Sequence, residues 1–272
     1  MPVTQIEAIY TDTGGAGIGT QLSRFFDSWL ELSNDSTSIP LREAVIAEGQ
    51  QTAYWIRNTA QQLDNLDMGN RAQIQDVVRD VNALLDELAQ LDEKLGPMLA
   101  QGTDGGTLFD DRNRLVRELS GLIDINTYVE AKGTQVITTS SGKLLLAGME
   151  AYHLDTEGTG SGQIVTYNGV DIGSEIHAGK LGGLLDFQNN VLGSFRTSLN
   201  DLARELASAV NSAHSQGATL NAPDDQAGDF FSVVAGNEAK SIGVEISDPA
   251  EIGARILGEA VGDATNARAL SD

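Results

Sequence analysis

The three histidines have the most versatile side-chain chemistry in this chain, and none lies in a metal-binding pattern. His153, His177 and His214 are far apart in the sequence. None belongs to an arrangement such as His-Glu-x-x-His, which places two ligands on one helix face. His214 falls at the end of a predicted helix, so we expect it on the surface, and we expect loop or surface roles for His153 and His177. The histidines therefore predict no metal or catalytic site.

A glycine cluster near the N-terminus superficially suggests a nucleotide-binding loop. It runs Gly15-Ala16-Gly17-Ile18-Gly19. The sixth position is Thr20 instead of glycine, no lysine follows as in a P-loop, and no strand–helix–strand pattern surrounds it. We interpret the cluster as a flexible linker before a helix.

Paired acidic residues are the remaining candidates for chemistry. Asp110-Asp111 and Asp224-Asp225 could suggest calcium, but neither pair has the alternating carboxylates and closing glutamate of an EF-hand loop. Asp110 suits the first turn of a helix, where the helix dipole favours an acid, and the second pair suits a solvated turn. No Gly-x-Ser-x-Gly nucleophile motif is present. We therefore predict no catalytic, cofactor-binding or metal-binding residues, no cofactor and no enzyme activity.

Composition excludes several classes of protein. The 39 acidic against 17 basic residues give a formal net charge of -22, which would repel nucleic acid and anionic lipid. The absence of cysteine excludes disulfides and thiolate chemistry. No apolar run approaches the roughly 20 residues that span a bilayer, and the first nine residues carry no secretory signal pattern. Aromatic residues make up only 5%, so the core must consist mainly of aliphatic side chains, which suits packed helices.

Two heptad stripes predict two long helices. Ile74, Val81, Leu88 and Leu95 are seven apart, and a second position lies between them; we expect a break or kink at Gly69-Asn70 and the helix end at Gly96-Pro97. The second stripe begins after Gly182-Gly183 and comprises Leu185, Leu192, Leu199, Leu206 and Ala213, with Gln188, Phe195, Leu202 and Ala209 at the second position. A bundle core within one chain and a seam between chains explain these stripes equally well.

Shorter elements complete the helical part. Apolar spacing predicts helices over 22–32 and 108–119, with Gly121 placed to cap the latter. A strand over 241–246 and a final short helix starting at Asp248-Pro249 follow.

Residues 122–178 change character to short runs rich in β-branched residues. We expect strands near 123–128, 134–139, 143–146 and 163–167, and Asn168-Gly169 predicts a hairpin turn. The predicted fold class is α+β: a discontinuous helical bundle of heptad-patterned long helices, 1–121 and 180–272, with a small antiparallel β domain inserted at 122–179.

Segments along nearly the whole chain match, in order, the pattern of one protein family. They are 22–33 with Pro40 and Arg42, 108–120, 124–146, 179–187, 209–231 and 262–270. The first contains Phe25-Phe26 and the fifth contains Asn211-x-x-His214-x-x-Gly217. Asn113 and Ala264 depart from the pattern, which has Asp and Asn there. The chain thus resembles the hook-associated protein 1 family of flagellar hook–filament junction proteins.

That resemblance implies a structural protein of the bacterial flagellum, involved in flagellum assembly and motility and without a catalytic site. It implies export through the flagellar secretion channel without a cleaved signal peptide, and hence an extracellular location. The implied partners are hook protein, the second junction protein, neighbouring copies in a ring layer and an export chaperone for the C-terminal segment, with no nucleic acid or membrane. The family's terminal helical segments are not matched, so we expect a core fragment.

Two other classes remain open. A secreted surface protein, such as an adhesin or a type III translocator, would share the acidic, cysteine-free composition. An enzyme using the β region as a substrate domain would need a pocket of convergent titratable groups.

Overall fold

The computed structural model describes residues 17–100, 105–130, 133–159, 162–221 and 225–271. The start of the glycine cluster, the loop at 102–104 and Asp224 lie outside them. Contacts divide the chain into two compact units, which we describe separately. Unit 1 comprises Met1–Asn65 and Ser194–Asp272, and unit 2 comprises Leu66–Gly193.

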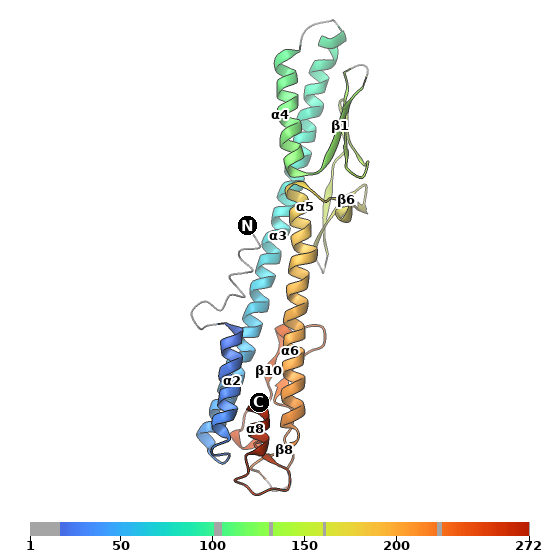
Figure 1. Cartoon of the computed structure of the whole chain (residues 1–272). Helices are drawn as coiled ribbons and strands as arrows, with labels where there is room; N and C mark the ends of the chain where they lie inside the picture. Colours follow the sequence, from blue (N-terminus) through green and yellow to red (C-terminus); the bar gives the residue numbers. More distant parts are fainter. Residues whose placement is uncertain (1–16, 101–104, 131–132, 160–161, 222–224, 272) are drawn as a thin grey trace. The chain divides into compact units, whose positions relative to one another are not determined.

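The longest element is helix α3, Ile39–Ala100, which contributes residues to both units (Figure 1). Of the break or kink predicted at Gly69-Asn70, the break was wrong, because α3 runs through both residues. Asn70 is buried, and its side-chain Nδ2 donates to the carbonyl of Leu184 at 3.1 Å. The predicted end at Gly96-Pro97 was also wrong: Pro97 lies inside the helix. Proline removes the backbone donor that would bond four residues back, and the helix continues for only three residues beyond it.

Unit 2 also contains α4 (Gly106–Leu122), α5 (Gly179–Asp186) and the π-helical turn η2 (Phe187–Leu192). Figure 1 shows α4 beside the second half of α3. Gly121 does not cap α4 as predicted; it lies within the helix, and the cap is Ile123, whose backbone is extended. Burial of Leu115, Leu119 and Ile123 continues the helix past the glycine.

Two small antiparallel sheets form the β region of unit 2. The first has the order β1-β2-β3-β4 and the second β5-β6-β7. Their bounds are β1 Ile125–Val129, β2 Gln135–Thr139, β3 Leu144–Ala147, β4 Glu150–Ala151, β5 Asp155–Thr159, β6 Gly162–Tyr167 and β7 Val170–Asp171, followed by the 3₁₀ turn η1 Gly173–Glu175. Asn168-Gly169 joins β6 to β7 with φ of 51° and 75°, and Tyr167 pairs with Val170. Both positive φ angles fit a type I′ hairpin, so the hairpin prediction is confirmed.

The first heptad stripe lies in the core of unit 2. Ile74, Val81, Leu88 and Leu95 are all at most 1% exposed. They belong to one cluster with side chains from α4, both sheets and α5, including Leu119, Ile137, Leu146, Val165 and Leu181. The stripe is therefore buried within its own chain.

Unit 1 contains α2 (Ile18–Leu32), the first part of α3, and α6 (Gly193–His214). The segments after α6 are short: β8 Gly217–Ala218, β9 Phe231–Ser232, α7 Glu238–Ser241, β10 Gly243–Val244, the 3₁₀ turn η3 Pro249–Glu251, β11 Arg255–Ile256 and α8 Thr265–Ser271. Pairing joins β10 to β9 and β11 to β8. The core holds an aromatic group in which Phe25 lies 5.5 Å from both Phe230 and Phe231 between ring centroids.

Two predictions for the C-terminal part were wrong. The strand over 241–246 is reduced to Gly243–Val244, because residues 238–241 form a helical turn. The helix predicted from Asp248-Pro249 is a single 3₁₀ turn. Asp248 accepts a hydrogen bond from the Ala250 amide, and the backbone becomes extended again at Ile252.

The second heptad stripe describes the buried face well at its first position and poorly at its second. At the first, Leu185, Leu192, Leu199 and Leu206 are buried and Ala213 is partly buried. At the second, Gln188 is buried, but Phe195 and Leu202 are only partly buried and Ala209 is exposed. Burial passes instead to Ala203, Ala207 and Val210. These positions follow the 3.6-residue period of a straight helix instead of the 3.5 of a coiled coil.

The α+β fold class is confirmed. The compact units have other boundaries than the predicted domains 1–121 with 180–272 and 122–179. The physical reason is the shared core: α4 and the second half of α3 bury their apolar faces together with the strands.

Candidate functional site

The three histidines lie in separate, dissimilar surroundings. His153 is exposed on the segment after β4, and its Nε2 lies 2.8 Å from an Oδ1 of Asp86. His177 is exposed, as predicted. His214 is completely buried, so its predicted surface position was wrong. Among the described residues, no three histidine or acidic side chains gather in a way that could hold a metal ion.

His214 is held by two backbone groups. Its Nδ1 lies 2.7 Å from the carbonyl oxygen of Gly228, and its Nε2 accepts the amide of Gly253 at 2.9 Å. The ring contacts Trp29 and Phe230 edge-on, at 5.9 and 5.7 Å between centroids. Burial lowers the pKa of His214 below its ordinary value. The residue is a neutral anchor that ties the end of α6 to two later segments.

A second buried polar anchor, in unit 2, is the ion pair between Asp92 on α3 and Arg112 on α4. The Arg112 Nη1 lies 3.3 Å from Asp92 Oδ1, and both side chains are at most 7% exposed. The other carboxylate oxygen accepts the amide of Gln135 at 3.0 Å, at the start of β2. Burial raises the pKa of Asp92, against the opposing effects of these partners. The pair joins two helices and a sheet.

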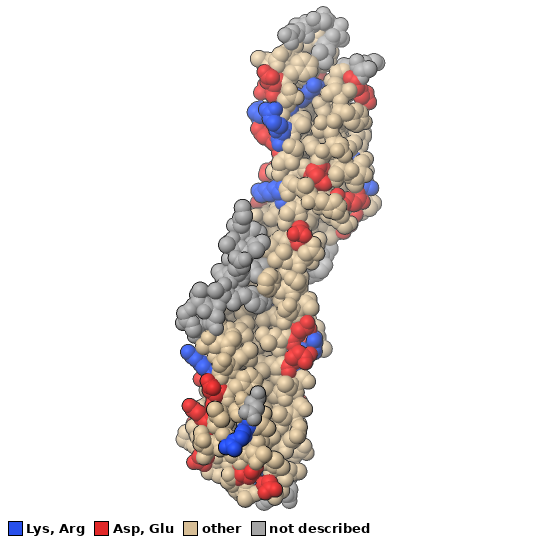
Figure 2. Space-filling view, in the orientation of Figure 1, with Lys and Arg blue, Asp and Glu red and all other residues tan. Residues whose placement is uncertain are grey.

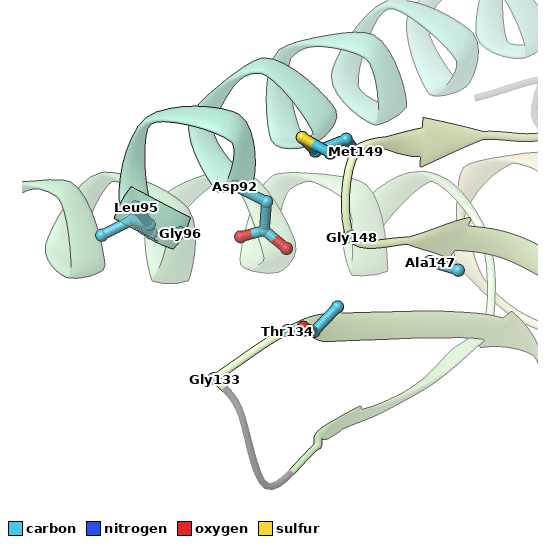
Figure 3. A pocket seen from close by; sticks show the side chains of 8 residues that line it. All are labelled: Asp92, Leu95, Gly96, Gly133, Thr134, Ala147, Gly148 and Met149. Atoms are coloured by element: carbon cyan, nitrogen blue, oxygen red, sulfur yellow. The ribbon is translucent and has the colours of Figure 1, made fainter. Parts of the chain in front are cut away.

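A cavity of about 260 Å³ lies beside this ion pair (Figure 3). Figure 3 shows Asp92 projecting from α3 toward Thr134 and the turn at Gly148. The remaining lining residues are Leu95, Gly96, Gly133, Ala147 and Met149. Among the described residues that line it, Asp92 is the one titratable group, and both its oxygens already have partners. These described residues do not form the nucleophile–base pair that acyl or phosphoryl transfer requires.

The paired acidic residues do not converge. Asp110 is exposed on α4, and Asp111 lies 3.5 Å from Arg114 on the same helix. Asp225 accepts the hydroxyl of Thr219 at 2.8 Å. Of the glycine cluster, residues 17–19 are described. Gly17 is the N-cap of α2, and Ile18 and Gly19 already lie in that helix, so the interpretation as a linker was wrong for these two residues.

Charged side chains on the face seen in Figure 2 are interspersed, with acidic and basic residues adjacent in several places. The described residues on that face form no continuous basic patch. Within the described part of the chain, no helix has both the length and the apolarity needed to cross a membrane.

The buried polar roles of Arg42 and Asp92 and the burial of His214 were not predicted from the sequence. Arg42 is completely buried and donates to the carbonyls of Ser36, Pro249 and Ile252 at 2.7, 3.1 and 2.8 Å. Burial, followed by the charge of Arg255, lowers its pKa to about 10. A signal was present for two of these residues, because Arg42 and His214 both fall in the segments that carry the family resemblance.

Known proteins provide an independent comparison. Residues 3–231 match the family model described as flagellar hook-associated protein FlgK helical domain. The chain is 27% identical to flagellar hook-associated protein 1 of Bacillus subtilis over 266 residues, which cover 86% of this chain and 52% of the relative. It is 27% identical to the Escherichia coli protein of the same name over 232 residues, 81% of this chain and 42% of the relative.

A solved structure shares the fold. The flagellar hook junction protein FlgK from Burkholderia pseudomallei superposes with a TM-score of 0.76 at 23% identity, over 86% of this chain and 43% of that one. The chain spans about half the length of the curated relatives it matches. Because the family model covers most of its residues, the chain belongs to the family of flagellar hook-associated protein FlgK helical domains.

Proposed function

We propose that this chain acts as a structural part of a hook–filament junction in a bacterial flagellum, without catalysis. The observation that supports it is the match of residues 3–231 to the FlgK helical domain. The buried anchors at His214 and at Asp92–Arg112 agree with a mechanical role, because each ties separate elements together.

The long helices supply stiffness in this proposal. Buried leucines on α3, each contributing roughly 1.5–3 kcal/mol when fully removed from water, hold the helix against its neighbours. Acidic residues on the outer faces stay solvated while the helices transmit force between hook and filament.

The proposed partners follow from the junction role. They are hook protein on one side, the second junction protein on the other, neighbouring copies of the chain in a ring layer, and a chaperone that accompanies export. The proposed location is extracellular, reached through the flagellar secretion channel without a cleaved signal peptide.

Deletion of the gene tests the role directly. We expect electron microscopy to show bare hooks, with unassembled flagellin shed into the medium, and a plasmid copy to restore filaments. Normal filaments on the deletion strain would refute the junction role.

A matched pair of plasmid variants connects that role to the fold. Leu88→Asp places a charge in the core of unit 2 and should fail to restore filaments, whereas Leu88→Ile keeps the volume and should restore them. Restoration of filaments by Leu88→Asp would show that the function does not require a folded unit 2.

A further inference from the structure

The geometry around His214 points to an acid-sensitive latch: protonation of this one imidazole breaks its bond to Gly253 and weakens the attachment of the C-terminal segment 249–271, which Arg42 and the pairing of β11 with β8 also hold. The inference does not depend on the flagellar role. It depends on which backbone groups hold the ring and what those groups hold in turn.

The backbone dictates the protonation state of the ring. Gly253 presents an N–H to Nε2 at 2.9 Å, so Nε2 must carry a lone pair. Gly228 presents a carbonyl oxygen to Nδ1 at 2.7 Å, so Nδ1 must carry the proton. A second proton on Nε2 would place two donors against each other in a completely buried site. The closed arrangement and the imidazolium are therefore incompatible.

Gly253, the residue through which His214 holds the C-terminal segment, lies in tightly packed backbone. Gly253 gives its N–H to His214 and its carbonyl oxygen accepts the Asn266 side chain of α8 at 2.6 Å. A Cβ built on Gly217, in β8, would approach the Gly253 carbonyl oxygen to 2.3 Å, and a Cβ built on Gly253 would approach the His214 carbonyl oxygen, at the end of α6, to 2.7 Å. The next residues continue the attachment, because the amide of Ala267 donates to the Ala254 carbonyl at 2.8 Å. Loss of the His214 bond thus weakens the packing around residues 253 and 254, to which α8 is hydrogen-bonded.

The charged groups that act on the ring have opposite effects. Arg42, on α3, opposes protonation of His214, and Asp229, next to the Gly228 acceptor, favours it. Arg255, on β11, is close enough to Arg42 to lower its pKa, so two buried guanidinium groups lie in this region. Trp29 and Phe230, which also pack on the ring, are uncharged. Burial is the largest effect, and together with Arg42 it keeps the closed ring neutral.

The sign of the pH dependence follows. When the segment opens, the imidazole meets water and takes up a proton at its ordinary pKa of 6.5, whereas the closed ring takes one only at a lower pH. Between those two values the open state holds one more proton, so the opening equilibrium constant rises about tenfold for each unit by which the pH falls. Above pH 6.5 the latch is insensitive to pH.

Amide hydrogen exchange on the full chain, followed by NMR between pH 7.5 and 5.0, tests the latch. Protection factors for the Gly253 and Ala267 amides should stay constant above pH 6.5 and then fall by up to about tenfold per unit. Amides of unit 2, such as that of Val77, should keep their protection. Constant protection of Gly253 across the whole range would overturn the proposal.

Matched variants assign the effect to one side chain. His214→Gln retains an acceptor and a donor but does not titrate, so the pH dependence should disappear. The double variant His153→Gln with His177→Gln removes the two exposed imidazoles and should behave as the parent. An unchanged fall in protection in His214→Gln would refute the latch.

The tautomer offers a measurement that does not depend on how that variant folds. The ¹⁵N shifts of the His214 ring in the parent at pH 7.5 should show the proton on Nδ1. A proton on Nε2 would contradict the hydrogen bonds on which the latch rests.

Discussion

At the scale of single residues, the interior of unit 2 is organised by a charge pair that the sequence did not single out. Asp92 and Arg112 are buried against each other, and the Arg112 guanidinium also lies 4.9 Å from the Phe109 ring centre. Burying two charges costs several kcal/mol per ion, which good geometry offsets only in part. What the pair contributes is the placement of α4 and β2 on α3.

Breaking that pair should cost more than removing it. Asp92→Asn leaves a buried guanidinium without a carboxylate, and Arg112→Met leaves a buried carboxylate, so each should lower the free energy of unfolding by about 3–5 kcal/mol. The double variant should recover most of the loss. Urea denaturation of all four proteins measures this as a double-mutant cycle. Additive losses would show that the two charges do not interact.

Two glycines give a contrast in how much space surrounds them. A Cβ on Gly217 meets the Gly253 backbone, so Gly217→Ala should destabilise the chain by about 1–3 kcal/mol. Gly121 lies inside α4 with nothing within 4 Å of a new Cβ, so Gly121→Ala should stabilise by about 0.5–1 kcal/mol. Thermal unfolding followed by circular dichroism compares them. Equal melting temperatures of the two variants would contradict the contrast between the crowded site at Gly217 and the open site at Gly121.

The burial of His214 could not be predicted from local sequence. Its two partners are backbone groups 14 and 39 residues further along the chain. A pattern of side chains carries no information about such bonds, whereas Asn168-Gly169 encodes its turn in two adjacent residues. The hairpin turn could therefore be predicted from adjacent residues, and the long-range hydrogen bonds of His214 could not.

At the scale of elements, the two heptad stripes differ in how well they describe the buried face. Leu88, on the first stripe, is 0% exposed, and Leu202, on the second, is only partly buried. The heptad spacing alone does not distinguish these two leucines. A stripe records spacing, but the packing partners decide whether the helix keeps a 3.5 or a 3.6 period.

Truncating these two leucines tests whether the two stripes contribute differently to stability. Leu88→Ala should lower the free energy of unfolding by about 2–5 kcal/mol, because it removes buried methyl groups and leaves a cavity. Leu202→Ala should cost less than about 1.5 kcal/mol, because much of that side chain already meets water. The midpoints of denaturant unfolding provide the comparison, provided that the dependence of the unfolding free energy on denaturant concentration has the same slope in both variants. A larger loss for Leu202→Ala would show that α6 buries the face predicted from the heptads.

At the scale of the whole molecule, the stripes left open whether they pack within one chain or between chains. In the structure, the first stripe is filled by side chains of its own unit. With a formal net charge of -22, copies of the chain also repel one another. Both observations favour a chain that remains single in dilute solution.

Sedimentation equilibrium at micromolar concentration should therefore yield the mass of one chain, 28.8 kDa. The mass should stay the same at 50 and 500 mM NaCl, because the side chains of the first stripe are already buried within the chain and screening the charge does not expose them. A dimer that strengthens with salt would show that apolar surface remains free for a second copy.

The division of unit 1 into two distant stretches has a consequence for how the chain is made. Unit 2 is one contiguous stretch, so all its residues are available as soon as residue 193 has been synthesised. The hydrogen bond from Arg42 to the Ile252 carbonyl can form only after a further 210 residues have been added. At about 5–20 residues per second, that interval lasts roughly 10–40 s. During it the aromatic side chains of α2 have no partners from residues 230 and 231, so α2 is synthesised before all of unit 2 but is enclosed only after unit 2 is complete.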